Sequence, residues 1–316
     1  MIKNCISLFL ALAILTGCNP AALKIDPCVE YFPPDHYIKK MPSAFEPLTA
    51  EERDTDWGRE LVIADNFAPD LDLYRAITGY KRALILLPPD KTERRFQIEY
   101  DILLCYYYGG KYHDAIETFE HGSLANVPAD FPAFRDLLII LYEAYGKVCS
   151  PYKQESILKL IQEYDAGLYS NLELSTALIN ADFCQIQTSY TEHPLGKPLQ
   201  SRFQGFYQNK LSVRRAQILN AVLPGAGYFY TGQNRTAITA FILNAAFIAA
   251  TYELFHNGYP AAGAITASLE FGWYFGGING AGLSAKYYND QLYNCYAKDF
   301  MLDHYLFPVL MLEKSF

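Results

Sequence analysis

The chain has 316 residues and a formal net charge of −8. An acidic chain is repelled by phosphate backbones and by anionic head groups, so nucleic acid is excluded as the expected partner. Tyr and Phe number 26 and 20, an abundance found in small helical repeats and in segments at bilayer interfaces. The length allows one large domain or two.

The first twenty residues, MIKNCISLFLALAILTGCNP, predict a secretory signal. Lys3 gives a positive start, and the apolar run 6–15 is too short to span a bilayer. The order Leu-Thr-Gly-Cys at 15–18 resembles a bacterial lipobox. That resemblance implies removal of residues 1–17 and acylation of Cys18, a firm membrane anchor. The alternative is an ordinary secreted protein with a chance cysteine at its cleavage site.

The same resemblance implies that the mature chain is held in the bacterial cell envelope, on the outer side of a membrane. Asn19 follows the lipidation cysteine. In enteric bacteria an Asp at that place would signal retention in the inner membrane, and Asn does not. A membrane-spanning helical hairpin within residues 212–290 would favour the inner membrane instead. The choice between inner and outer membrane therefore stays open.

Residues 18–55 predict a proline-rich tether. Six prolines lie between positions 20 and 47, and each interrupts a continuous helix. We expect this segment to lift the folded part off the membrane.

Residues 56–185 predict a helical domain. Apolar side chains recur at steps of three and four, as in the run 137–144. Turn signals such as YGGK at 108–111 divide the region into helices joined by short turns. The expected fold class is all-α, with the helices paired as hairpins.

Two stretches of this domain resemble the tetratricopeptide repeat. The first has the alanines, aromatic and proline of the repeat's second helix: Ala76, Tyr80, Ala83 and Pro88. The second has the repeat's aromatics, glycine and alanine in register: Tyr106, Gly110, Tyr112, Ala115 and Phe119. The resemblance implies close packing of paired helices and binding of proteins or peptides on a concave face. An unrelated helical bundle is the alternative.

The next segment, 186–211, is polar and contains the turn-forming run HPLGKP, which predicts a linker. The composition then changes. Between 213 and 282 only five side chains are charged: Arg214, Arg215, Arg235, Glu253 and Glu270. We therefore predict a hydrophobic domain at 212–290 and a C-terminal tail at 291–316.

Two apolar segments in this domain predict a helical hairpin. The run 237–255 nearly meets the bilayer requirement of about 20 residues, and NGYP at 257–260 is a turn without Lys or Arg, which gives no orientation. In the second segment small residues recur every four positions: Ala264, Ser268, Gly272, Gly276, Gly280 and Ser284. Each mid-helix glycine costs about 1 kcal/mol relative to Ala, so we expect this glycine zipper to make close helix contacts. A soluble hairpin packed on its neighbours is the alternative to a spanning one.

The loop before the hairpin, LPGAGYFYTGQNRTA, is glycine-rich, and a loop of this kind can bind a phosphate at a helix N-terminus. It lacks the third glycine of a dinucleotide fingerprint, the preceding strand, and the Gly-Lys-Ser or Gly-Lys-Thr of a P-loop. The stretch instead resembles a motif of bacterial membrane proteins with paired hydrophobic helices, the TM2-type and P13-like proteins. The matching positions, which would form the hairpin turn, are Pro224, Gly225, Gly227, Tyr230, Gly232 and Gln233.

Two acidic residues fall within the hairpin. Glu253 lies near the end of its first helix, and Glu270 lies ten residues into the second. An acid inside a membrane segment is costly and is a functional candidate by default. Glu270 would need a partner such as Arg215, Arg235 or Asn244. The alternative is that Glu270 faces water.

Together these features predict an all-α, lipid-anchored envelope protein that is not an enzyme. Neither a metal nor a cofactor is expected, because the cysteines lack CxxC spacing and the six histidines are scattered. The expected function is scaffolding or assembly of envelope complexes, with envelope proteins or peptides docked on the repeats. The main alternative is an oligomeric membrane channel or transport component built from the hairpins, with Glu270 in its lumen. A homo-oligomer is thus open, and an envelope hydrolase has little support.

Overall fold

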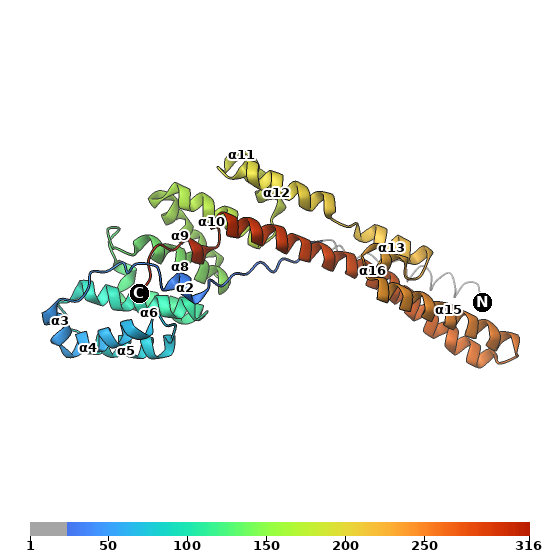
Figure 1. The fold of residues 1–316 in the computed structure, drawn as a ribbon, viewed down its shortest axis with the longest axis horizontal. Coiled ribbons are helices and arrows are strands. Elements are labelled where there is room, and N and C mark those ends of the chain that lie inside the picture. The colour runs from blue at the N-terminus through green and yellow to red at the C-terminus, as the bar shows by residue number, and fades with distance from the viewer. Residues whose placement is uncertain (1–23) are drawn as a thin grey trace. The chain divides into compact units, whose positions relative to one another are not determined.

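A computed structural model describes residues 24–316, and every regular element in that range is a helix. The one strand-like contact there is an isolated bridge between Ser43 and Ser315. The predicted all-α class is therefore confirmed for the described part of the chain (Figure 1). The predicted signal peptide, 1–17, and the acylation of Cys18 lie outside the described residues.

The chain divides into two compact units. The cleft unit comprises Glu30–Ala177 and Met301–Phe316, and the hairpin unit comprises Leu178–Phe300 with the described residues up to Val29. The cleft unit contains α2 (Asp35–Ile38), α3 (Ala50–Asp54), α4 (Asp56–Phe67), α5 (Leu73–Leu86), α6 (Thr92–Tyr108), α7 (Tyr112–His121), the 3-10 turn η2 (Ser123–Asn126), α8 (Phe134–Lys147), α9 (Pro151–Tyr164), α17 (Pro308–Met311) and nearly all of α10 (Ala166–Ile179). The hairpin unit contains α11 (Phe183–Glu192), α12 (Gly196–Asn209), α13 (Val213–Val222), α14 (Ala226–Tyr230), α15 (Asn234–His256) and nearly all of α16 (Pro260–Asp303).

Helices of the cleft unit begin and end where the sequence supplies the required groups. At α3 the Thr49 hydroxyl accepts from the backbone N–H of Glu52, and the Glu52 carboxylate accepts from that of Thr49, which makes a capping box. Gly110 takes a φ of +66° after α6, a conformation that glycine adopts without strain. Pro151 occupies the first turn of α9, where its missing N–H costs nothing.

Consecutive helices from α4 to α9 pack against one another in chain order. The pair α4 and α5 is especially close, because a Cβ added at Gly79 would lie 2.9 Å from the Cβ of Ala64. Buried apolar side chains of α4, α5 and α6 form one continuous core with Leu48 and Leu87. Each helix from α5 to α8 thus packs against both the helix before it and the helix after it.

The predicted tether, 18–55, is wrong for its described part. Ile38 and Leu48 are buried in the cleft unit, and Ile25 and Val29 are buried in the hairpin unit. Prolines prevent a long helix here, but the apolar residues between them still gain about 25 cal/mol for each Å² of apolar surface that they bury.

The predicted C-terminal tail, 291–316, is also wrong. α16 continues to Asp303, and the segment after it packs on α8. The Asp136 carboxylate accepts from the backbone N–H groups of Glu313 and Lys314 at 2.9 and 2.8 Å. Five apolar side chains after α16 are buried: Leu306, Phe307, Leu310, Met311 and Leu312. They lie outside any long helix, so helical periodicity in the sequence does not predict their burial.

The predicted linker, 186–211, is helical, formed by α11 and α12. Phe203 and Phe206 of α12 are fully buried and pack against the ring of Tyr293 on α16, with centroids 5.9 and 5.7 Å apart. Pro198 does not interrupt α12 because it lies in the first turn, where helices tolerate proline. This aromatic cluster is a core of the hairpin unit.

Candidate functional sites: an apolar hairpin and an acidic cleft

The glycine-rich loop forms two tight turns that bracket the short helix α14. Gly225 has a φ of +93°, and its N–H donates to the side chain of Asn220 at 2.9 Å. Gly232, with a φ of +80°, makes the second turn before α15. A Cβ on Gly225 or Gly227 would collide with the carbonyl oxygens of Ala237 and Ala216, so both positions require glycine. The loop connects closely packed helices. The Gly225 N–H already donates to Asn220, so it is not free to donate to a ligand.

The other motif residues take less constrained places in these turns. The Tyr230 hydroxyl accepts from the backbone N–H of Ser212 at 3.1 Å, which ties α14 to the start of α13. Pro224 is half-buried just after α13 ends, and Gln233 is exposed just before α15 begins.

α15 and the first half of α16 form an antiparallel hairpin whose tip is 257–259 (Figure 1). One seam joins the two helices. Thr251 donates to the hydroxyl of Thr266 at 3.0 Å, and a Cβ added at Gly263 would lie 3.0 Å from the ring of Phe255. Farther from the tip the Tyr274 hydroxyl donates to the carbonyl of Ala221 on α13.

The rest of the hairpin surface is apolar and exposed. α15 is the one helix in the described range that is long and apolar enough to cross a membrane, and only 6% of its apolar stretch is buried. A soluble core helix would be mostly buried, and a signal sequence would lie near the N-terminus; α15 fits neither description. Exposed apolar side chains occur on both helices: Ile238, Phe241, Ile242, Ile248, Tyr252, Phe255, Ile265, Leu269, Phe271, Trp273 and Phe275.

The predicted glycine zipper is wrong for its first four members, which are exposed rather than in helix contact: Ala264, Ser268, Gly272 and Gly276. A Cβ added at Gly272 or Gly276 would meet nothing within 4 Å. The reason is geometric. With about 3.6 residues per turn, an i, i+4 row drifts by about 40° at each step, so six members wind around the helix and cannot all face one neighbour.

The last two members of the row face α14 instead of α15. A Cβ on Gly280 would collide with the hydroxyl of Tyr228. The hydroxyls of Ser284 and Thr231 lie 2.8 Å apart and share a hydrogen bond. Close packing therefore exists at the base of the hairpin, between α16 and the glycine-rich loop.

Glu270 lies in the hairpin seam without a hydrogen-bond partner among residues 24–316. Neither carboxylate oxygen accepts a hydrogen bond from the described residues, so the predicted pairing with Arg215, Arg235 or Asn244 is wrong. Asn244 instead donates to the carbonyl of Ala240 at 2.6 Å.

A pocket of about 380 Å³ surrounds Glu270, and its other walls are almost entirely apolar. Its lining includes Ile248, Ala267 and Tyr274. Glu253 differs, because it is exposed near the tip and accepts from the amide of Asn257 at 3.1 Å.

In the cleft unit, the first repeat-like stretch lies in the α4–α6 core. Ala76, Tyr80 and Ala83 are fully buried, and Pro88 follows the end of α5. The Tyr80 hydroxyl donates to a carboxylate oxygen of Asp65 at 3.0 Å.

The second repeat-like stretch spans the turn from α6 to α7. Ala115 is fully buried, and the ring of Tyr112 contacts that of Tyr107 at 6.2 Å. The Tyr106 hydroxyl accepts from Lys81 at 2.9 Å, and Phe119 is half-buried. Both stretches therefore serve packing, with Gly110 at the turn.

The cleft unit also holds a cleft of about 810 Å³ that the sequence analysis missed. It lies among the segment before α3, the start of α6 and the loop before α8. Phe131 forms the buried part of its floor, and the half-buried rings of Phe45 and Phe96 pack on it with centroids 5.6 and 6.1 Å away. The capping box at Thr49–Glu52 was the one local signal in this region.

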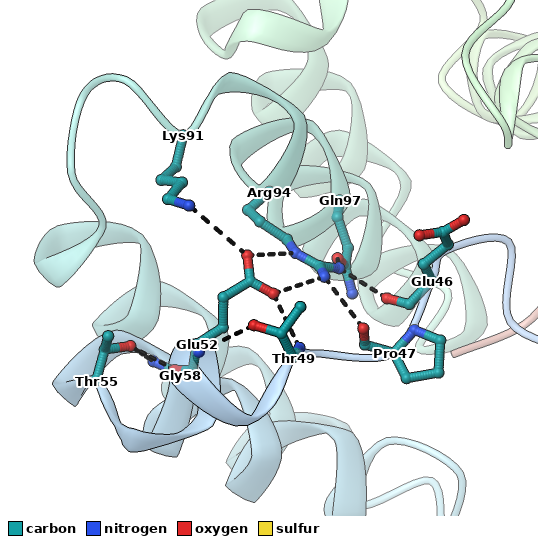
Figure 2. Close-up of polar contacts among 9 residues, drawn as sticks. All are labelled: Glu46, Pro47, Thr49, Glu52, Thr55, Gly58, Lys91, Arg94 and Gln97. Atoms are coloured by element: carbon teal, nitrogen blue, oxygen red, sulfur yellow. Dashed lines mark hydrogen bonds and ion pairs between the residues drawn. The ribbon is translucent and has the colours of Figure 1, made fainter.

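Arg94 fixes one wall of the cleft (Figure 2). Its guanidinium donates to the carbonyl of Glu46 at 2.8 Å, to the side chain of Gln97 at 2.7 Å and to the Glu52 carboxylate at 2.9 Å. The hydrogen bond from Arg94 lowers the pKa of the Glu52 carboxyl, so this pair stays ionised. We call this set of hydrogen bonds from Arg94 the latch. The latch joins α3 and the segment before it to α6.

The charges of the cleft are unbalanced. Five acidic and two basic residues line it, a formal excess of three negative charges. Both bases, Lys91 and Arg94, pair with Glu52. The other acids have no ion pair within the described residues: Glu46, Asp90, Glu93 and Asp130. An anionic rim over an aromatic floor is suited to binding.

The described chain is thus an all-helical protein with a packed helical unit, a cleft and an apolar helical hairpin. Comparisons with protein-family models, with curated proteins and with solved structures found no match.

Proposed function

We propose that the protein is a lipid-anchored scaffold or assembly factor of the bacterial envelope, held in the membrane by Cys18 and by the α15–α16 hairpin. The observation that carries the proposal is the exposed apolar surface on the sides of both helices away from their seam. Two helices cannot bury their apolar sides on each other, whereas lipid can cover the remainder. The cleft unit then remains in the periplasm to dock envelope proteins or peptides.

The spacing of charges along the hairpin supports this proposal. Arg235 and Glu253 are the charged residues of α15 and lie eighteen positions apart, about 27 Å along a helix axis. A bilayer has a hydrocarbon core of about 30 Å. Glu270 lies ten positions from Pro260, about 15 Å from the tip and close to the midplane of such a core.

Lipid attachment at Cys18 is compatible with a membrane surface at the base of the hairpin. The backbone N–H groups of Asp26 and Cys28 donate to Asp290 and Asn294 on α16, at 3.1 and 2.9 Å. A chain of eight residues reaches from Cys18 to Asp26 and spans at most about 28 Å. An acylated Cys18 can therefore reach a membrane surface at the base of the hairpin.

The tetratricopeptide-like arrangement belongs to this proposal as its docking element. It is supported by the successive packing of α4 to α9 and by the complete burial of Ala76, Ala83 and Ala115. Helical repeats of this kind bind extended partners on an open surface.

The first test is membrane fractionation of the wild-type protein and Cys18→Ala, each washed with alkaline carbonate. We expect Cys18→Ala to stay in the membrane pellet, because the hairpin remains inserted. Its complete release would show that lipid is the only anchor and would overturn the hairpin part of the proposal. The wild-type protein controls for recovery.

The second candidate is an oligomeric channel or transport component formed by the hairpins. One observation favours it, the partnerless carboxylate of Glu270 in its pocket. Purified protein in liposomes would then conduct cations, and Glu270→Gln would abolish the leak, while Glu253→Gln near the tip would keep it. Absence of a leak from the wild-type protein would exclude this candidate.

A further inference from the structure

We propose that the cleft binds an extended, positively charged peptide segment of a partner protein, which places an aromatic or aliphatic side chain on the aromatic floor. The inference rests on the proposed scaffold function and names the chemistry of the docked partner. It is carried by the cleft itself, its floor and its charges.

The floor calls for an apolar side chain. Phe45 and Phe96 each keep part of a ring exposed within the cleft, while Phe131 beneath them is buried. Aromatic rings prefer tilted or edge-on partners with centroids about 4.5–7 Å apart, the arrangement these three already adopt with one another. A further ring or aliphatic side chain extends this cluster and removes apolar surface from water.

The rim determines the charge of the ligand. Glu46, Asp90, Glu93 and Asp130 are exposed at the cleft and have no ion pair within residues 24–316. The local cations are already committed to Glu52. An anionic ligand is therefore repelled, and a cationic one gains Coulomb energy at several points of the rim.

The distribution of the acids distinguishes a peptide from a metal ion. Among the described residues, no three His, Cys, Asp or Glu side chains converge as a metal site requires. The acids instead surround an opening of about 810 Å³. An extended peptide presents alternate side chains about 6.6 Å apart, so it can offer cations to separate rim acids and a ring to the floor.

The latch at Arg94 prepares the cleft for binding. It holds the carbonyl groups of Glu46 and Pro47, at 2.8 and 3.3 Å, together with the Glu52 carboxylate (Figure 2). These bonds fix the segment that carries Phe45 before any ligand arrives. A preformed site avoids the entropy cost of ordering a loop on binding.

The experiment measures binding of a short labelled peptide in which Lys and Phe alternate to the full-length protein in lipid nanodiscs, by fluorescence anisotropy. We expect saturable binding that weakens as salt rises from about 0.05 M to about 0.3 M. Glu93→Gln with Asp130→Asn should weaken it about fivefold, because each exposed ion pair contributes a fraction of a kcal/mol. Phe96→Leu, which conserves most of the volume, should also weaken it.

The matched control is Glu117→Gln with Glu163→Gln, which changes the net charge equally at exposed positions of α7 and α9 outside the cleft. It should bind the peptide as the wild type does. Equal weakening by this control would overturn the inference. So would equal binding of a peptide with Glu in place of Lys, or of a Lys peptide with Gly in place of Phe. Unchanged melting of each variant confirms that its fold is intact.

The outcome is independent of the membrane test. If the peptide fails to bind while Cys18→Ala still resists carbonate, the cleft inference fails and the anchored hairpin stands. If the peptide binds but Cys18→Ala is released, the hairpin proposal fails and the cleft inference stands.

Discussion

The two tryptophans of the chain lie in different units and have opposite environments. Trp57 on α4 is 3% exposed, in a core shared with α5 and α6. Trp273 on α16 is 51% exposed, although the next residue, Tyr274, contacts α13. Both helices carry bulky apolar residues, so composition alone does not separate them. The extent to which neighbouring helices cover each side chain does.

The comparison teaches how burial depends on topology. Each helix from α4 to α8 is followed by another that packs against it, and the C-terminal segment adds a further cover on α8. The α15–α16 hairpin has one seam near its tip and packs on α13 and α14 at its base, and the apolar side chains between these contacts are largely exposed.

The largest effect is expected from lysines on the hairpin. Ile242 and Leu269 are 57% and 58% exposed near its middle. In the Cys18→Ala background, Ile242→Lys with Leu269→Lys should cost about 5–7 kcal/mol of membrane insertion, because a central lysine costs about 2.5–3.5 kcal/mol. Carbonate washing should then release the protein. Ile85→Lys, at an exposed position of the cleft unit, is the control and should not change retention. If the hairpin faces water, both variants behave alike.

The second effect compares the same substitution in both units. Gly79→Leu must push α4 and α5 apart, and overpacking of this kind costs about 3 kcal/mol. Gly272→Leu meets open space and removes a mid-helix glycine, so it should stabilise its helix by just under about 1 kcal/mol. Urea unfolding followed by far-UV circular dichroism measures both, because the regular elements of both units are helices. Similar midpoints for the two variants would contradict the close contact between Gly79 and Ala64.

The third effect is a pH dependence of the cleft unit. Burial raises the pKa of Asp65 from 3.8 to about 6. The folded state then holds this proton more tightly than the unfolded state, so stability falls as pH rises from about 4 to about 6 and levels off above that. Two pH units correspond to about 3 kcal/mol at most, less with partial relaxation of the site. Asp65→Asn should reduce this slope and raise the urea midpoint at pH 7.

Tyr80→Phe provides the control for that prediction. The hydrogen bond from Tyr80 partly offsets burial and lowers the pKa of Asp65. Its removal should therefore raise this pKa further and shift the end of the slope to higher pH. A slope that is unchanged in both variants would assign the pH dependence to other groups.

The smallest effect concerns the C-terminal segment. Asp136→Ala removes an acceptor from the backbone N–H groups of Glu313 and Lys314 and should cost about 2 kcal/mol. Carboxypeptidase should then digest the last residues faster. Glu313→Gln is the control, because its ion pair with Arg135 at 3.4 Å is largely exposed. Equal digestion of both variants would show that Asp136 does not hold the segment.

Local patterns in the sequence predicted much of the fold. The apolar periodicity indicated α8 and α9, and the turn at 257–260 placed the hairpin tip between His256 and Pro260. Such signals work because helix and turn preferences depend on neighbouring residues. The all-α class followed from them.

The errors arose where distant residues determine the structure. Ile25 and Val29 are buried although prolines surround them, and the Asp26 backbone is held by Asp290, 264 residues away. The linker and the tail were mistaken for loops for the same reason. The cleft escaped detection because its floor combines Phe45, Phe96 and Phe131 from three separate segments. The apolar periodicity of a single helix cannot show that side chains from separate segments lie together.

The tip of the hairpin, 257–259, has a consequence for the pathway of membrane entry. Three residues span about 10 Å, a third of the hydrocarbon thickness. If the hairpin inserts as proposed, α15 therefore cannot cross while α16 remains behind, and the two helices enter together. The barrier to the proposed insertion is then the passage of Glu253, His256 and Asn257 through hydrocarbon.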